Sequence, residues 1–116
     1  MEQRTGYYFG TEINGKWYRR CNRDGLLARG RGKYWFDEKG VFFLRTMTKN
    51  PIMISYSDIY DIQTGSWHSG RWGQGHPVVK ILWHENGISL SSGFIFTKNK
   101  IEVTNIVNLL KSKTCS

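Results

Sequence analysis

Several residue types that mark particular classes of protein are scarce in this chain. Only two of its 116 residues are cysteines, Cys21 and Cys115. A secreted disulfide scaffold carries more, so we expect no bridge between them. No run of about 18 apolar residues is present, which excludes a transmembrane helix. The first residues lack the apolar stretch of a signal peptide, and we therefore expect a cytoplasmic protein.

Motifs of catalysis and of metal binding are also missing. His68, His76 and His84 are spaced by eight residues, with no cysteine or carboxylate at ligand spacing, so we expect no metal and no cofactor. The glycine-rich stretches 30–32 and 65–75 lack the Lys-Ser/Thr pair of a phosphate-binding loop. No nucleophile is paired in the sequence with a base and an orienting group. We therefore expect a protein that is not an enzyme.

Aromatic residues, by contrast, are abundant. The chain holds five Trp, six Tyr and six Phe, which offset a modest apolar fraction of 39%. Aromatic side chains bury large areas, so 116 residues suffice for one domain with a core of its own.

The clearest local signal is a hairpin around Asn86-Gly87. Asn-Gly favours a two-residue turn with positive φ at both positions. Placing the turn there pairs Trp83 with Leu90 and Val79 with Phe94, so the apolar partners fall on one face. We expect this face to be buried, and a bulge in the second strand at 91–93. The residues of the buried face are Val79, Ile81, Trp83, Leu90 and Phe94.

A second hairpin joins the aromatic stretches 33–36 and 41–45 through the polar loop 37–40. Gly40 ends this loop, where we expect it to adopt a left-handed conformation. Short strands are predicted at 52–54 and 59–64, with a turn at 56–58 between them.

The chain closes with an amphipathic helix. Asn99 is a suitable N-cap, and Glu102 stands three residues later, as in a capping box. Val103, Ile106, Val107 and Leu110 follow the spacing of one apolar face, and the helix is predicted to reach about Lys111. The polar face lacks the basic character of a membrane-lying helix, so we expect the apolar face to cover the sheet.

The order of these elements resembles the pleckstrin-homology superfold, and within it the GRAM-like and bacterial PH-like group. The resemblance rests on the aromatic hairpin, the strand at 51–54, the Asp58-Ile59 step, the 78–83 hairpin strand and the closing helix. It covers about residues 26–111 of a single domain and leaves 1–25 as an N-terminal extension. The fold expected is mainly β, a small strongly bent antiparallel sheet or barrel closed by one C-terminal helix.

The resemblance implies a non-enzymatic module that binds a lipid head group or a protein. Phosphoinositide-binding members carry Lys and Arg around the first inter-strand loop. The corresponding loop here, 37–40, is acidic on balance, which argues against that ligand. The stretch 67–76 is also longer and richer in glycine than the resemblance predicts.

Positive charge is concentrated in one segment. The net charge is +8, and seven of the 17 Lys and Arg residues lie between 16 and 33, with Asp24 the only acid. The segment either binds phosphates weakly or is a solvated basic surface. The candidate anion-binding residues are Arg19, Arg20, Arg29, Arg31 and Lys33.

Aromatic residues lie among these cations, at Trp17, Tyr34 and Trp35. They indicate either core positions or stacking platforms for single-stranded nucleic acid. A small basic nucleic-acid-binding protein is therefore the alternative function.

A further candidate site is the glycine-rich loop 65–77. It carries Trp67, His68, Arg71 and Trp72, which either bind a partner or pack back on the sheet. Taken together, the sequence predicts a binding module for a protein or an anionic partner.

Overall fold

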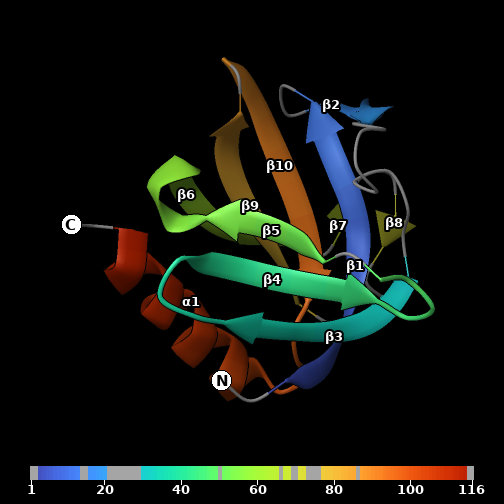
Figure 1. The fold of residues 1–116 in the computed structure, drawn as a ribbon, viewed down its shortest axis with the longest axis vertical. Coiled ribbons are helices and arrows are strands. Elements are labelled where there is room, and N and C mark those ends of the chain that lie inside the picture. Colours follow the sequence, from blue (N-terminus) through green and yellow to red (C-terminus); the bar gives the residue numbers. More distant parts are fainter. Residues whose placement is uncertain are drawn as a thin grey trace.

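A computed structural model describes residues 3–13, 16–20, 30–49, 51–65, 67–68, 71–72, 77–85 and 87–114, and for 16–20, 67–68 and 71–72 it describes the backbone alone. A large bent antiparallel sheet and a C-terminal helix make up most of the fold (Figure 1). The strands of the sheet are β1 (Arg4–Ile13), β2 (Lys16–Arg20), β3 (Gly30–Phe36), β4 (Gly40–Arg45), β5 (Ile52–Ser55), β6 (Ile59–Gly65), β9 (Val78–Glu85) and β10 (Ile88–Ile95). The remaining elements are the 3-10 turn η1 (Tyr56–Asp58), the short strands β7 (Trp67–His68) and β8 (Arg71–Trp72), and the helix α1 (Lys100–Thr114).

The sheet runs in the order β5-β4-β3-β1-β10-β9-β6, with β2 paired to β1 beside this path. Its two end strands do not pair, so the sheet is bent but not closed. The predicted fold is confirmed: it is mainly β, with a bent antiparallel sheet and one C-terminal helix. No helix among the described residues is long and apolar enough to cross a membrane.

The hairpin of β9 and β10 has the predicted register. Trp83 pairs with Leu90, Ile81 with Ser92 and Val79 with Phe94. Gly87 has a φ of 78°, as its place in the turn requires, whereas Asn86 lies outside the described residues. The five residues predicted to form the buried face are all buried. The alternation of the sequence was therefore a reliable guide to this hairpin.

The predicted bulge in β10 is wrong. Residues 88–94 pair without interruption with β9, and the irregularity lies on the opposite neighbour, β1. There Tyr8 pairs with Phe94 and Gly10 with Gly93, which leaves Phe9 as the extra residue. Gly10 has a φ of 98°, a conformation that glycine adopts readily, and so allows the strand to bend.

Strand β1 is an element that the sequence pattern did not reveal. The segment set aside as an N-terminal extension contains the strand that lies between β3 and β10. Its Tyr8 is fully buried, with ring centroids 5.8 Å from Phe43 and 5.2 Å from Phe94. The core therefore depends on residues at the start of the chain.

A chain of hydrogen bonds crosses the core beside this bulge. The hydroxyls of Tyr8 and Thr11 are bonded to each other, and Thr11 Oγ1 lies 2.6 Å from Ser92 Oγ. The indole of Trp83 donates to Ser92 Oγ at 3.0 Å. All four residues are buried, and β1, β9 and β10 each contribute to the chain. Because buried polar groups are costly without partners, these bonds fix how the three strands sit together.

The hairpin of β3 and β4 is also confirmed, with Phe36 paired to Val41. Asp37 closes its loop by accepting hydrogen bonds from the backbone of Lys39 and Gly40 at 2.8 and 3.2 Å. The left-handed conformation predicted for Gly40 is wrong, because Gly40 is not among the glycines with positive φ. A glycine is required there for space: a Cβ would lie 2.1 Å from the carbonyl oxygen of Ile54 on β5.

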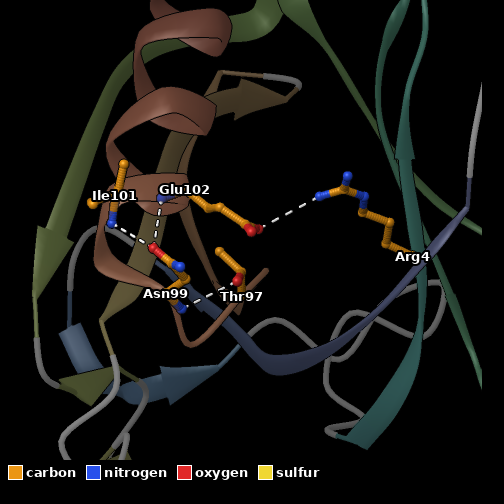
Figure 2. Close-up of polar contacts among 5 residues, drawn as sticks. All are labelled: Arg4, Thr97, Asn99, Ile101 and Glu102. Atoms are coloured by element: carbon orange, nitrogen blue, oxygen red, sulfur yellow. Dashed lines mark hydrogen bonds and ion pairs between the residues drawn. The ribbon is translucent and has the colours of Figure 1, made fainter.

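Helix α1 packs against β6 and η1 and buries Val103 and Leu110. Its N-cap is Asn99, as predicted, and the Asn99 side chain accepts bonds from the backbone of Ile101 and Glu102 at 2.9 and 3.2 Å (Figure 2). The second half of the predicted capping box is absent. Glu102 turns instead to Arg4 on β1, 3.6 Å away, while the backbone N–H of Asn99 donates to Thr97 Oγ1.

We expect Gly40→Ala to lower the free energy of unfolding by about 2–3 kcal/mol, because the added methyl would push β5 away from β4. Urea unfolding measures the loss. Gly87→Asn is the matched control, since Gly87 has open space around its Cα and Asn tolerates its positive φ, so it should cost less than about 1 kcal/mol. If Gly40→Ala were as stable as the wild type, the close approach of Ile54 would not constrain this position.

We expect Asn99→Ala to cost about 1 kcal/mol, since two backbone N–H groups of the first helical turn lose their acceptor. Asn99→Asp should retain most of the stability, because a carboxylate accepts the same bonds and suits the helix N-terminus. Urea midpoints of the two variants test this. Asn105→Ala, at an exposed position within the helix, is the control, and an equal effect there would contradict the capping role.

Candidate functional site

The outer face of β3, β4 and β5 carries the clearest candidate site. Along β3, Gly32, Tyr34 and Phe36 are buried, while Arg31 and Lys33 are exposed. Alternate residues of a strand share a face, so Arg31, Lys33 and Trp35 point outward together. We call the outward positions of these three strands the outer face: Arg31, Lys33, Trp35, Phe42, Leu44, Met53 and Ser55.

The charge of the outer face is of one sign. None of its seven residues is acidic. Neither Arg31 nor Lys33 forms an ion pair with another described residue. The outward residues of the neighbouring β1, Thr5 and Tyr7, pair with Lys33 and Arg31 and are not acidic either. Two neighbouring cations on one strand, without an acidic partner in the part of the chain that the structure describes, favour an anion at this face.

A cross-strand row of three apolar side chains, two of them aromatic, lies next to the two cations. Trp35 pairs with Phe42, which pairs with Met53 on the next strand. The rings of Trp35 and Phe42 are stacked, with centroids 5.3 Å apart and planes 4° apart. Met53 remains 40% exposed. The solvated face of an antiparallel sheet is usually polar, so an apolar row here is unusual.

The turn between β4 and β5 adds an exposed apolar group near the same cations. Met47 is 97% exposed and has a φ of 70°, which is uncommon for a residue other than glycine. Bonds on both sides hold this turn: Thr46 N–H donates to the carbonyl oxygen of Arg31, and Thr48 N–H donates to that of Arg45. The first bond places the turn directly beside Arg31.

Of the five residues predicted to bind anions, the structure brings together Arg31 and Lys33. Arg19 and Arg20 lie on β2, whose backbone alone is described, and Arg29 lies outside the described residues. Of the three aromatic residues discussed with them, Tyr34 is a core residue, whereas Trp35 faces outward and Trp17 lies on β2. Sequence reasoning missed Phe42 and Met53, although alternation from Val41 and Ile54 would have placed both on the outer face.

The second candidate, in the loop 65–77, contains a small hairpin. Strands β7 and β8 form a separate two-stranded sheet in which Trp67 pairs with Trp72 and His68 with Arg71. The four predicted partner-binding residues are thus brought side by side along the backbone. Their role in binding stays a prediction.

Polar groups also meet on the outside of β6, β9 and β10. The ring of Tyr60 stacks on His84 with centroids 4.2 Å apart, and the Tyr60 and Ser89 hydroxyls are 2.6 Å apart. Ser89 and His84 are cross-strand partners. Their side chains both contact Tyr60: the Ser89 hydroxyl is bonded to the Tyr60 hydroxyl, and the His84 imidazole is stacked on the Tyr60 ring. Within the described part of the chain, no group of three or more His, Cys, Asp or Glu side chains is placed to hold a metal ion.

One buried group has a strongly shifted pKa. Tyr56 in η1 is buried, and its hydroxyl has no hydrogen-bond partner among the described residues. Burial, and secondarily the negative charge of Asp37, raise the pKa of Tyr56 from 10.0 to about 12. The ammonium of Lys113 lies 5.6 Å from the centre of the same ring. Tyr56 is therefore a packing residue at the junction of the β3–β4 loop, η1 and α1.

We expect the folded state to lose stability as the pH rises from 10.0 to about 12. In this window Tyr56 ionises in the unfolded chain but not in the folded one, so deprotonation favours unfolding. Tyr56→Phe should reduce this loss and, at neutral pH, be at least as stable as the wild type, because it removes a buried hydroxyl without a partner. Urea unfolding of both proteins across this pH range makes the comparison. Parallel pH curves would contradict the assignment.

Comparison with known families agrees with this architecture. The family model described as "Bacterial PH domain-like" matches residues 1–110, nearly the whole chain and including β1. A search of curated proteins found no match. With its bent sheet and its C-terminal helix, the chain belongs to the bacterial PH domain-like family.

Proposed function

We propose that this domain is a non-enzymatic binding module that contacts an anionic partner through the outer face of β3–β5. The observation that carries the proposal is the pair Arg31 and Lys33. Both side chains are exposed on one face of one strand, and no outward carboxylate of β3, β4 or β5 offsets them. Positive charge that is not paired with another described residue is available to an external anion.

The surroundings of the two cations support this proposal. The sheet beneath them is supported by the core, because inward residues of the same strands, such as Tyr34 and Phe43, are buried in it. Exposed Met47 stands at the turn next to Arg31, where it would add apolar contact at the edge of a bound surface. A few charges of this kind give weak, salt-sensitive binding with little selectivity among anions.

The acidic groups among the described residues lie outside the outer face. Asp37 and Glu38 are in the β3–β4 loop, and Asp58 and Asp61 are on η1 and β6. Asp37 is engaged by backbone N–H groups of its own loop, and Asp61 by Ile62 and Gln63. Among the described residues, the outer face thus carries basic and no acidic side chains, which suits it to anions.

We expect Arg31→Glu with Lys33→Glu to abolish retention on heparin and sedimentation with phosphatidylserine vesicles at low salt. Each cation near an anionic membrane contributes about 1 kcal/mol, so losing both costs about 2 kcal/mol before repulsion is counted. Circular dichroism should show an unchanged fold, because both side chains are exposed.

The matched control reverses the same amount of charge elsewhere. Lys98→Glu with Lys100→Glu changes two exposed residues, one just before α1 and one at its start, and should leave most of the binding intact. Equal losses in both double variants would show that only net charge matters. A wild-type protein that binds neither heparin nor vesicles would refute the proposal and direct attention to the β7–β8 hairpin.

A further inference from the structure

The outer face carries an aromatic side chain in line with its positive charges. Its two cations are followed on the same strand by Trp35, and successive outward residues of a strand are about 7 Å apart. The line from Arg31 through Lys33 to Trp35 therefore presents two positive groups and then an aromatic ring. A partner that fits this line would carry negative charges beside flat apolar groups.

The aromatic end of this line is already a stack. Trp35 and Phe42 lie nearly parallel, and Met53 stands beyond Phe42 in the same cross-strand row. Each ring of such a pair uses one face on its neighbour, so a further flat ring would extend the stack at Trp35. Trp35 is also the member of the row nearest to the cations, since Lys33 is its outward neighbour on β3.

The size of the row helps to choose between partners. A stable protein–protein interface covers about 800 Å² on each side, more than three partly buried side chains supply. A simple polyanion would use Arg31 and Lys33 alone, and a membrane would take up Trp35 and Phe42 as apolar groups without making use of their parallel stacking. Single-stranded nucleic acid uses both features, because its phosphates meet cations and its bases stack on aromatic side chains.

We propose that the outer face of β3–β5 binds single-stranded nucleic acid, with a base stacked on Trp35 and phosphates at Lys33 and Arg31. This inference rests on the anionic partner of the proposed function and names its chemical class. Recognition is tolerant of sequence, because every base offers a flat face and phosphates are common to all. The strand is DNA or RNA, and the experiment separates the two.

The first test asks whether bases contribute to binding. Fluorescence anisotropy at low salt compares labelled oligothymidine of about 12 nucleotides with an abasic strand of the same length, which has the phosphates without the bases. We expect the oligothymidine to bind about tenfold more tightly. Equal affinity for the two strands would overturn the inference. Oligouridine of the same length, run in parallel, shows whether RNA is preferred over DNA.

The second test assigns the stacking to Trp35. Trp35→Leu keeps an apolar side chain but removes the ring, and it should lower the affinity for oligothymidine to that of the abasic strand. Trp35→Tyr keeps a ring and should retain most of the preference. Retention on heparin should not change in either variant, because Arg31 and Lys33 remain.

Folding is checked by circular dichroism and by the thermal midpoint. If Trp35→Leu does not fold, Trp35→Met, which keeps a long apolar side chain without a ring, replaces it. A folded variant without the Trp35 ring that still prefers oligothymidine to the abasic strand would overturn the assignment to this face.

The outcomes separate this inference from the proposed function. Binding to heparin without any preference for bases would refute nucleic acid and leave an anionic partner in place. Stronger binding to phosphatidylserine vesicles than to oligothymidine would have the same meaning and indicate a membrane. Failure to bind heparin, vesicles and oligonucleotides alike would refute both.

Discussion

The fold depends on the place of β1 at the centre of the sheet. This strand pairs with β3 on one side and with β10 on the other, and so joins the β3–β4–β5 half to the β10–β9–β6 half. Its Tyr8 contacts an aromatic ring from each half, Phe43 and Phe94. Without this strand the two halves would expose the edges of β3 and β10, each with unpaired backbone groups. The first strand of the chain is thus held by pairing on both of its edges.

The same arrangement explains why the outer face is separate from the core. Tyr34 and Phe43 face inward with Tyr8, and their strand neighbours Lys33 and Phe42 necessarily face outward. A buried core on one side of the sheet fixes the orientation of the side chains on the other side. The outer face can therefore vary in chemistry without disturbing the packing, and here it combines cations with an aromatic stack.

The closing helix and the sheet support each other through few but specific contacts. Val103 and Leu110 are the buried residues of α1, on the side that faces the sheet. Asn99 accepts hydrogen bonds from backbone N–H groups of the first helical turn. The exposed pair of Glu102 with Arg4 adds little to stability, as is usual for surface ion pairs. Burial of apolar groups places the helix against the sheet, and the N-cap fixes where the helix begins.

The sequence alone was sufficient wherever a local pattern sets the structure. Asn86-Gly87 with its flanking alternation predicted the register of β9 and β10, and the spacing from Val103 to Leu110 predicted the buried side of α1. Only the tertiary structure could place β1, because its bulge at Phe9 breaks the alternation and its partners are distant in sequence. It also decided that Gly40 serves close packing and not a turn, and that Trp35, Phe42 and Met53 form one row. Each of these depends on which strands become neighbours, and long-range pairing leaves no mark in a short stretch of sequence.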